Sequence, residues 1–348
     1  MIKTAVVILN WNGKALLEKF LPSVVACSDG DDVRIYVADN NSSDDSLEFL
    51  KTHYTSVSVI CLDKNYGFAG GYNRALEKIE ASYFVLLNSD VEVAPGWLTA
   101  LVKKMDSNEK IAGCAPKILA FNDKTKFEYA GAAGGFIDNY GFTFCRGRVF
   151  DTEETDNGQY NLSGSIFWAS GACLMIRSSL FLENGGLDED FFAHMEEIDL
   201  CWRLKNMGYK FEYVPESVIY HVGAATLSKA SPRKTYLNFR NNLYMLYKNI
   251  KPGKLFSTLF VRLILDGVAG LRFFMKGELD NFFSVIEAHF SFYAKLGSLR
   301  KKRKIILERS VFFDHPEIYP HSLVFDYYVG KKTHFSQLNF KISEQQNS

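Results

Sequence analysis

The sequence lacks the features that mark secreted, membrane-spanning or nucleic-acid-binding proteins. Its six cysteines are scattered over 348 residues without a CxxC pair, so we expect reduced, buried thiols and a cytosolic protein rather than a disulfide framework. Lys+Arg and Asp+Glu number 40 each, which leaves no net charge to attract nucleic acid. The N-terminal stretch MIKTAVVILNWNG has too short an apolar core for a signal peptide and predicts a strand instead.

Apolar runs alternate with amphipathic stretches in the N-terminal part of the chain. The runs favour strands that are covered on both faces, and the amphipathic stretches have the spacing of helices that bury one side. The predicted strands are 4–9, 33–38, 57–62 and 83–93, and the predicted helices between them are 16–25, 46–53 and 72–79. This alternation with short connections predicts an α/β fold with a mostly parallel central sheet and right-handed crossovers.

Polar residues follow these strands. Asn10 closes the first strand, Asp39 closes the second, and Asn88-Ser89-Asp90 interrupts the fourth. Because the strands are expected to be parallel, these residues share the sheet edge where open α/β sheets bind ligands. A carboxylate such as that of Asp90 needs a cationic partner there, commonly a divalent ion that carries phosphates. Taken alone, Asn88-Ser89-Asp90 could equally well cap the following turn. Because the other polar clusters lie at the same sheet edge, we favour ligand binding.

Three glycines, Gly67, Gly70 and Gly71, precede the third predicted helix. Their spacing matches neither the GxGxxG dinucleotide fingerprint nor the GxxxxGK[ST] phosphate loop. Glycines before a helix still allow a ligand to approach the backbone closely. By itself this segment predicts a turn that permits ligand contact and names no particular ligand.

The middle of the chain mixes helices and strands with one long irregular segment. Residues 120–165 lack periodicity, which is typical of a binding loop or of a small inserted sheet. The other elements predicted here are a helix at 97–105, strands at 111–118 and 168–177, an acidic helix at 194–204 that ends before Gly208, and a strand at 210–214 before His221.

A break at Lys251-Pro252-Gly253 follows a predicted helix at 235–249 and suggests a domain boundary. We therefore expect one domain at 1–250 and a helical region at 251–348, with a polar, loose tail from Ser336.

The helical region combines apolar and cationic segments. Residues 255–271 are apolar but contain Arg262 and Asp266, so they are too short and too charged to cross a bilayer. An aromatic helix at 282–299 runs into RKKRK at 300–304. This pattern fits a surface that lies on anionic lipid, and it fits equally a helical appendage packed on the first domain with a solvated basic turn.

Seven motifs in a fixed order carry a resemblance to a known family. They are VVILNWNG, VADNNSSDDS, NYGFAGGYNRAL, YFVLLNSDVEV, ASGACLMIR, GGLDEDFFAHMEEIDLCWRL and YHVG. With them, the segment from Lys3 to Asn249 resembles the inverting glycosyltransferases of family 2, and their rhamnosyltransferase-like branch in particular. The resemblance implies the GT-A fold, a Rossmann-like, mostly parallel sheet that binds a nucleotide-diphospho-sugar.

The resemblance also implies roles for residues at the sheet edge. Asp39 matches an acidic residue that contacts the pyrimidine base, and Asn10 lies under the nucleotide. The positions that match the segment over the nucleoside and its phosphates are Asn65, Gly70, Gly71 and Asn73. Asp90 matches the last residue of a metal-binding DxD-type motif, and Asn88 stands beside the nucleotide where the pattern often has Asp. His221 matches a further metal ligand or phosphate contact, although a lone histidine favours a capped or buried imidazole.

The implied reaction needs a metal ion and a base. Mg²⁺ or Mn²⁺ would offset the charge on the leaving diphosphate, and Glu197 stands where the family has the Asp that accepts the acceptor's proton. Glu196 and Asp199 lie beside it. Repulsion among three carboxylates in four residues raises the pKa of one of them toward that of a general base. The alternative is a solvated helix start, where acids meet the positive end of the helix dipole. Trp202 and Arg203 are expected on the acceptor side, although Trp202 fits the core equally well.

The implied partners are a dTDP- or UDP-sugar, with rhamnose as the candidate sugar, and a glycan or polyprenyl-diphosphate-linked acceptor in cell-surface polysaccharide synthesis. The setting is the cytoplasm, with peripheral contact at the inner face of the membrane and no nucleic acid. A sugar-1-phosphate nucleotidyltransferase would carry a basic, glycine-rich loop where this chain has NWNGKALLEK. An inactive nucleotide-sugar binder or scaffold remains an alternative because of Asn88 and Glu197.

Overall fold

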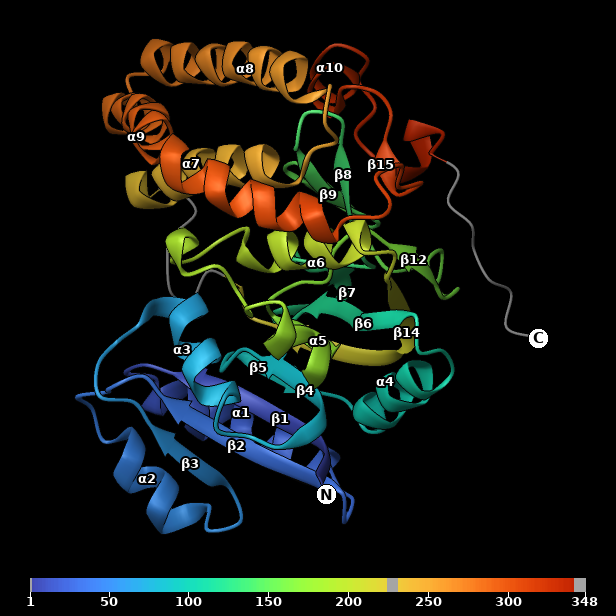
Figure 1. The fold of residues 1–348 in the computed structure, drawn as a ribbon. Helices are drawn as coiled ribbons and strands as arrows, with labels where there is room; N and C mark the ends of the chain where they lie inside the picture. Colours follow the sequence, from blue (N-terminus) through green and yellow to red (C-terminus); the bar gives the residue numbers. More distant parts are fainter. Residues whose placement is uncertain (1, 224–230, 341–348) are drawn as a thin grey trace.

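One large sheet forms the centre of the computed structural model, which describes residues 2–223 and 231–340 (Figure 1). In spatial order its strands are β12 (Gly164–Ile166), β14 (Lys210–His221), β6 (Ile111–Ala120), β13 (Cys173–Arg177), β4 (Ala81–Leu87), β1 (Ile2–Asn10), β2 (Val33–Asp39) and β3 (Ser58–Cys61). The pairs β4–β1, β1–β2, β2–β3 and β6–β14 are parallel, whereas β13 runs antiparallel between β4 and β6. The predicted α/β fold with a central sheet is confirmed; the sheet is parallel from β4 to β3, as predicted, and mixed beyond β4, where β13, β12, β5 (Val91–Val93) and β7 (Asp123–Phe127) pair antiparallel.

Helices cover both faces of this sheet. Along β1 the side chains alternate: Ala5 and Val7 join one apolar cluster, and Val6 and Ile8 join the other, as the two-residue period of a strand requires. The helices α1 (Lys14–Cys27), α2 (Ser46–His53) and α4 (Trp97–Asp106) contribute to the second cluster, and α3 (Gly67–Leu76), α5 (Ser178–Glu183) and α6 (Glu196–Asn206) to the first. Strands buried on both faces explain the continuous apolar runs of the sequence.

Two local predictions are wrong in detail. The glycine-rich segment is not a turn before a helix but the start of α3, which begins at Gly67 rather than Tyr72. The run 83–93 is not one strand. Strand β4 ends at Leu87, and residues 91–93 form the separate short strand β5 (Val91–Val93), which pairs with β14. The backbone N–H of Asn88 donates to the carbonyl of Ala172 (3.1 Å), so the pairing beside β13 extends to the first residue of the predicted polar tripeptide.

The irregular segment 120–165 is a small inserted sheet, one of the two predicted alternatives. After β7 (Asp123–Phe127), which pairs with β6, it contains β8 (Gly135–Asp138), β9 (Thr143–Cys145), β10 (Arg148–Val149) and β11 (Thr152–Glu153). A strand from the end of the chain, β15 (Ile318–Tyr319), pairs with β8. The two sides of the predicted boundary at residue 250 therefore share this sheet.

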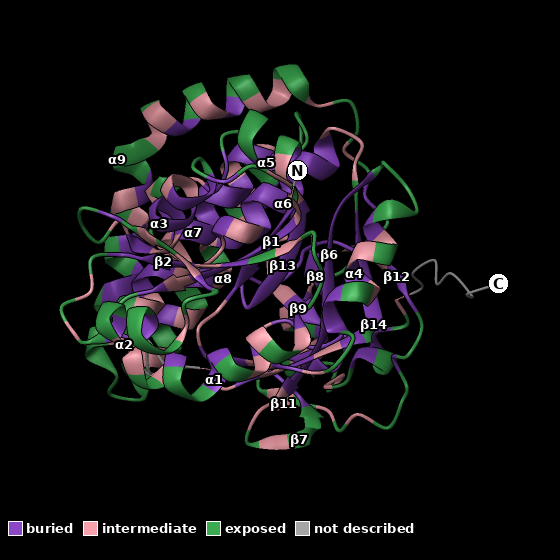
Figure 2. Ribbon diagram, turned by 90° about the horizontal axis from the view of Figure 1, so that it is seen from below, coloured by how far each residue is buried: buried purple, intermediate pink, exposed green. Residues whose placement is uncertain are grey.

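The C-terminal part is mainly helical, with α7 (Pro232–Asn249), α8 (Leu255–Met275), α9 (Leu279–Arg309) and the short α10 (Leu323–Tyr328). Figure 1 shows α7, α8 and α9 beyond α6, with α8 outermost. In Figure 2 the central strands are buried, whereas the outward turns of α9 are exposed. None of the helices in the described residues is long and apolar enough to cross a membrane.

The start of the predicted loose tail is ordered. Phe335–Leu338 forms a 3₁₀ turn in which Phe335 and Leu338 are buried, and the Phe335 ring packs against Phe136 and Tyr160. Aromatic packing therefore corrects the prediction for the beginning of the tail. Its end, 341–348, lies outside the described residues.

Candidate active site

The ends of β1 and β2 form a buried polar cluster. The side-chain amide of Asn10 donates to the carboxylate of Asp39 (3.1 Å) and to the hydroxyl of Ser42 (3.2 Å), and the second Asp39 oxygen accepts the backbone N–H of Ser42 (2.9 Å). The Asn10 side-chain oxygen is buried with no hydrogen-bond partner in the described chain. Beside it Trp11 is 53% exposed. The two residues predicted to meet the nucleotide are thus brought together, next to an open aromatic ring.

A second asparagine ties this cluster to the α3 loop. Asn40 donates from its amide to Asn65 Oδ1 and to the Gly67 carbonyl, both at 3.0 Å, and accepts the backbone N–H of Tyr66 (2.9 Å). Asn65 Oδ1 also accepts the N–H of Gly67 (2.8 Å). Asn65 therefore lies at the sheet edge as predicted, in a loop that Asn40 holds rigid.

Two of the three buried glycines of α3, Gly70 and Gly71, are explained by packing. A Cβ on Gly71 would lie 2.8 Å from Leu9 Cδ1, and one on Gly70 would lie 3.0 Å from Tyr66 Cβ. The first distance is shorter than non-bonded carbon atoms tolerate, so α3 could not rest on β1 with a larger residue at position 71, and the second leaves little room for a side chain beside Tyr66. A nucleotide contact of Gly70 and Gly71 stays a prediction.

Asn73 has a different role from the predicted one. Its amide nitrogen donates to the carbonyl of Leu187 (2.8 Å), and its Oδ1 accepts the N–H of the same residue (2.9 Å). Both polar ends of the side chain are occupied in this way, so Asn73 positions the segment before α6 instead of a nucleotide.

Asp90 and His221 meet at the ends of β4 and β14, as the sequence predicts for a metal pair. Asp90 Oδ1 lies 3.1 Å from His221 Nε2, and Asn88 Nδ2 lies 3.4 Å from the same nitrogen. His221 Nδ1 faces Glu128 Oε2 at 3.3 Å. Burial lowers the pKa of His221, but the contacts with Asp90 and Glu128 outweigh it and raise that pKa to about 10. Without a cation, the imidazolium itself balances the two carboxylates.

The Asp90–His221 pair has suitable geometry and chemistry for a divalent cation. Adjacent ligands of an octahedral Mg²⁺ or Mn²⁺ ion lie about 3 Å apart, close to the separation of Oδ1 and Nε2. Glu128 has the place of the carboxylate that orients a metal-binding histidine through its other ring nitrogen. Across 2–223 and 231–340 no three His, Cys, Asp or Glu side chains converge on one metal position, so the other ligands would be diphosphate oxygens and water.

The acidic helix α6 begins after a strained turn. Phe192, His194 and Met195 have positive φ angles of 66°, 69° and 73°, a backbone conformation that residues other than glycine rarely adopt. Glu196 and Glu197 follow directly as the first residues of α6. Such strain persists only where neighbouring structure enforces it.

Helix α7 supplies that support through Asn241. Its fully buried amide donates to three carbonyl groups of the turn, at 2.8–3.0 Å, those of Phe191, Ala193 and His194. The neighbouring Arg240 also donates to the Phe191 carbonyl (2.9 Å). The C-terminal helices therefore fix the place at which the two glutamates enter the site.

The two glutamates are enclosed and incompletely bonded. Each has one oxygen that is buried and lacks a hydrogen-bond partner within the described ranges. Burial is the largest influence and raises the pKa of both; the charge of Glu197 raises the pKa of Glu196 further. Backbone N–H groups, including that of Gly171, favour the charged form of Glu197. Of the two carboxyls, Glu196 therefore has the more strongly raised pKa, and the backbone N–H groups favour the charged form at Glu197.

Asp199 is a scaffold residue and not part of the catalytic group that the sequence predicts. It is completely buried, and its two oxygens accept from Arg203 Nε (2.9 Å), Lys248 Nζ (2.8 Å) and Asn249 Nδ2 (2.8 Å). With two cations and an amide bound to it, this carboxylate has no free site for a proton from a substrate.

The predicted acceptor contacts of Trp202 and Arg203 are corrected in the same way. Trp202 is 5% exposed and packs edge-to-face on Phe167, with ring centroids 5.2 Å apart, so it belongs to the core. Arg203 donates to the carbonyls of Asn184 (2.7 Å) and Gly186 (2.6 Å) as well as to Asp199. Its guanidinium holds the loop before the acidic turn.

The segment 170–172 joins the acidic turn to the metal pair. Gly171 contacts the Glu197 carboxyl through its backbone N–H, and the next residue, Ala172, accepts the backbone N–H of Asn88 (3.1 Å). A Cβ on Gly171 would lie 3.2 Å from the Phe68 ring and 3.8 Å from Glu197 Cδ. The base candidate and the metal candidate thus adjoin neighbouring residues of one strand end.

Sequence reasoning missed three residues of this site: Glu128, Asn40 and Asn241. Asn40 stands directly after Asp39 in the quoted VADNNSSDDS motif, which was a usable signal. Asn241 lies in a polar stretch of a predicted helix, and Glu128 lies in the non-periodic segment. Nothing local marks these two, because their partners come from distant strands and loops.

The fold is that of the GT-A glycosyltransferases. A structure of S. aureus TarS 1–349 in complex with UDP-GlcNAc aligns with a TM-score of 0.57 at 14% identity, over 88% of this chain and 91% of that chain. GalNAc-T7 with UDP, GalNAc and Mn²⁺ aligns with a TM-score of 0.57 at 17% identity, over 71% of this chain and 48% of the other.

The chain belongs to glycosyl transferase family 2, whose model matches residues 5–182. It is 27% identical over 221 residues to the N-acetylglucosaminyl-diphospho-decaprenol L-rhamnosyltransferase of Mycobacterium tuberculosis, covering 59% of this chain and 71% of the relative. It is 24% identical over 219 residues to rhamnosyltransferase WbbL of Escherichia coli K12, covering 60% and 80%. The protein is therefore a rhamnosyltransferase-like glycosyltransferase, an enzyme of the hexosyltransferase type.

Proposed function

We propose that this enzyme transfers a rhamnosyl group, with inversion, from a dTDP- or UDP-sugar to a hydroxyl of a lipid-linked saccharide at the cytoplasmic face of the membrane. The names of two relatives support the sugar, and one of them supports a polyprenyl-diphosphate acceptor. The nucleotides named with the structural neighbours support a nucleoside diphosphate donor.

One observation carries this proposal: Glu197, a half-buried glutamate with one buried carboxyl oxygen that has no partner in the described chain, adjoins the strand end that also positions the Asp90–His221 pair. Glu197 contacts Gly171, and Ala172 binds the backbone of Asn88. Since the donor's diphosphate belongs at the sheet edge and the base must stand at the acceptor hydroxyl, a transferase needs these two groups close together. A protein that only binds nucleotide-sugars has no use for a carboxylate with a raised pKa in that place.

In the proposed reaction the acceptor oxygen attacks the anomeric carbon from the face opposite the diphosphate. A C–O bond forms to the acceptor while the bond to the diphosphate breaks, and the hydroxyl proton passes to the Glu197 carboxylate. The pKa of the neighbouring Glu196 is raised well above its ordinary value, which favours a protonated Glu196 beside Glu197. Asn10, Asp39 and the loop held by Asn40 position the nucleoside.

Asp90 and His221 would hold a Mg²⁺ or Mn²⁺ ion, with Glu128 orienting the imidazole. When bound, such an ion supplies positive charge that offsets the charge on the departing diphosphate. The Asn88 amide lies near enough to His221 to take part in positioning the same ligands.

The Glu197→Gln variant tests the proposal. General-base catalysis contributes about 10²–10⁴-fold, so we expect transfer to fall by that factor while donor affinity stays unchanged, with Glu18→Gln on the exposed face of α1 as the matched control. Unchanged turnover would contradict the assigned base. Transfer absent from the wild type as well would indicate an inactive binder, and pyrophosphate release from a nucleoside triphosphate would indicate a nucleotidyltransferase.

The donor is identified by thermal unfolding with dTDP, UDP and GDP, each with and without Mn²⁺. A ligand that binds only the folded state raises the unfolding temperature, and at equal concentration a tighter ligand raises it more. We expect the largest shift with dTDP or UDP and Mn²⁺ together. A shift with GDP alone would contradict a pyrimidine nucleotide donor.

A further inference from the structure

Helix α8 has its polar side inward and its apolar side outward. The residues it buries recur every four positions and are Thr258, Arg262, Asp266 and Gly270. The apolar residues that it exposes, each by more than half, are Phe256, Phe260, Ile264, Val268, Leu271, Phe274 and Met275. A helix on the surface of a water-soluble core shows the opposite arrangement, so this outward face is suited to an apolar surrounding.

The inward polar face is fully engaged, which fixes the orientation of the helix. Arg262 Nε donates to Asp266 Oδ1 (2.7 Å), and its NH1 donates to the Asn242 side chain (2.5 Å) and the Tyr140 carbonyl (3.2 Å). His289 of α9 contacts the other Asp266 oxygen at 3.3 Å. Turning α8 over would break these contacts and set apolar side chains against Asn242 Oδ1 and the Tyr140 carbonyl, which would lose this donor at an energetic cost.

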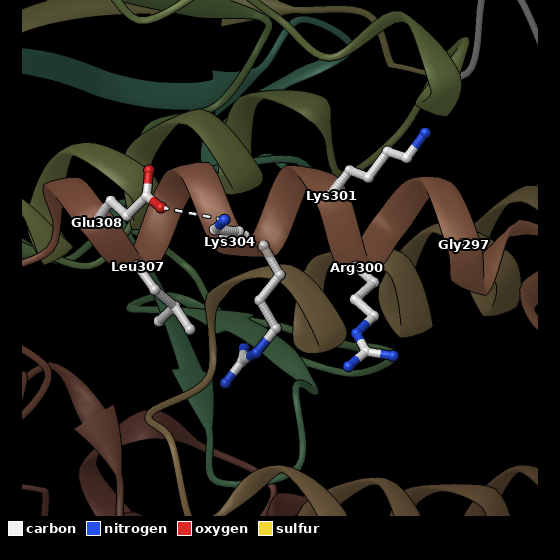
Figure 3. A pocket seen from close by; sticks show the side chains of 7 residues that line it. Gly297, Arg300, Lys301, Lys304, Leu307 and Glu308 are labelled. Carbon is white, nitrogen blue, oxygen red and sulfur yellow. Dashed lines mark ion pairs between the residues drawn. The ribbon is translucent and has the colours of Figure 1, made fainter.

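Helix α9 continues the same kind of surface. Its exposed apolar residues follow one another at intervals of three or four and are Leu279, Phe283, Ile286, Phe290 and Tyr293. At 3.6 residues per turn, the next positions of this face are Gly297, Arg300 and Lys304. Figure 3 shows the Arg300, Lys301 and Lys304 side chains extending from this part of α9, with Glu308 at 4.0 Å from Lys304. One helix face therefore changes from apolar to cationic along its length.

The opposite side of α9 faces the catalytic domain. Lys302 bonds to Asp188 (2.5 Å) and to Asp190 (2.7 Å), and Lys295 bonds to Asp190 (3.0 Å). These contacts hold α9 against the loop that precedes the acidic turn. The apolar and cationic face is thus directed away from the body of the protein.

We propose that the α8–α9 face lies on the surface of an anionic phospholipid bilayer. Apolar side chains that enter the acyl region beside cations that meet lipid phosphates form the pattern of an interfacial helix, and neither helix is suited to cross the bilayer. The single acidic residue within α8, Asp266, is buried, so the exposed side of that helix presents no carboxylate to the lipid. On α9, Asp280 and Glu287 lie about a quarter turn from the apolar line.

A second copy of the chain fits this face less well than lipid. A two-fold contact centred on Arg300 and Lys304 would bring the like charges of both copies together, and one centred on the apolar residues of α9 would set each cationic group against apolar side chains of the other copy. Glu308 lies 4.0 Å from Lys304 and does not neutralise the whole group. Lipid phosphates neutralise these cations instead.

Vesicle co-sedimentation of the full chain tests this proposal independently of any enzymatic activity. We expect binding to vesicles of phosphatidylcholine mixed with phosphatidylglycerol, weakened by salt, and little binding to phosphatidylcholine alone. The double variant Phe260→Ser/Phe290→Ser should lower the partition coefficient on the order of tenfold or more. Arg300→Gln/Lys304→Gln should lower it on the order of thirtyfold on anionic vesicles.

Matched controls lie elsewhere on the surface. Leu182→Ser on α5 and Lys103→Gln on α4 remove an exposed apolar group and an exposed cation, and we expect both to leave vesicle binding unchanged. Thermal unfolding confirms that each variant folds. Absence of vesicle binding, equal binding to neutral and anionic vesicles, or a dimer in sedimentation equilibrium that the Phe260→Ser/Phe290→Ser variant dissociates would each overturn the proposal.

Discussion

The carboxyl groups at the β1–β2 sheet edge and at the turn before α6 differ in how completely they are hydrogen-bonded. At the edge, both oxygens of Asp39 accept hydrogen bonds from neighbouring residues. At the turn, Glu196 and Glu197 each retain a buried oxygen without a partner in the described chain, on a backbone with three positive φ angles. A carboxylate with both oxygens bonded is rigid and suited to binding, whereas a carboxyl pair with unbonded oxygens is suited to exchanging a proton. The fold thus separates recognition from reaction.

The same contrast holds within α6 itself, between Asp199 and Glu196, and Asp199→Ala is expected to have the largest effect. Removing Asp199 leaves Lys248 buried with one carboxylate partner fewer, so we expect the free energy of unfolding in urea to fall by about 3–5 kcal/mol. Glu196→Gln replaces a protonated carboxyl with an amide of similar shape and should cost less than about 1 kcal/mol. Equal losses for the two variants would contradict the distinction.

Glu128→Gln sharpens the comparison at the metal pair. Glu128 Oε2 faces His221 Nδ1 and also accepts the backbone N–H of Ala130, and losing such an orienting carboxylate typically weakens metal binding about 10–100-fold. We expect the Mn²⁺ concentration for half-maximal activity to rise by that factor, with the maximal rate at saturating Mn²⁺ changed much less. Glu92→Gln on β5 is the control, and an equal response of both variants would remove Glu128 from the site.

The pH dependence of transfer probes the acidic turn directly. Burial raises the pKa of Glu197, and the base acts only when it has lost its proton. The value of kcat/KM should therefore fall about tenfold per pH unit below an inflection that lies above 4.5, the ordinary value for Glu. The residual activity of Glu197→Gln should lack this inflection. The same inflection in both proteins would assign it to another group.

Trp202→Phe is expected to have the smallest effect. Because Trp202 packs on Phe167 in the core, the change should lower stability by about 1 kcal/mol and leave the KM for the acceptor unchanged. A large rise of that KM with unchanged stability would restore the acceptor contact predicted from the sequence.

The sequence was informative where one local signal decides the structure. Continuous apolar runs such as that of β1 and the polar residues after them are sufficient to predict a parallel sheet and its binding edge, including the positions of Asn10, Asp39 and Asp90. The motif order predicts Glu197 as the base, and the structure places this residue at the start of α6. These features depend on neighbours along the chain and on the shared edge of parallel strands.

Other features depend on distant partners and could not be predicted. Glu128 meets His221 only because β14 runs beside β6. The acids of α6 look alike in sequence, and the burial of Lys248 against Asp199 separates their roles. Periodicity gave α8 an apolar side, but the partners of Arg262 decide that this side faces outward. In each case the local sequence is compatible with more than one arrangement, and contacts with residues far away in the sequence decide which one forms.

The most direct test of the account is whether Asp90 serves nucleotide binding and Glu197 serves the reaction. It compares the wild type, Asp90→Asn and Glu197→Gln by calorimetric titration with the nucleoside diphosphate, each with and without Mn²⁺. We predict that Asp90→Asn lowers the affinity at least about tenfold with Mn²⁺ and changes it little without the metal, while Glu197→Gln binds as the wild type does in both conditions. Equal affinity of Asp90→Asn and wild type in the presence of Mn²⁺, or a loss of affinity in Glu197→Gln, would contradict the account.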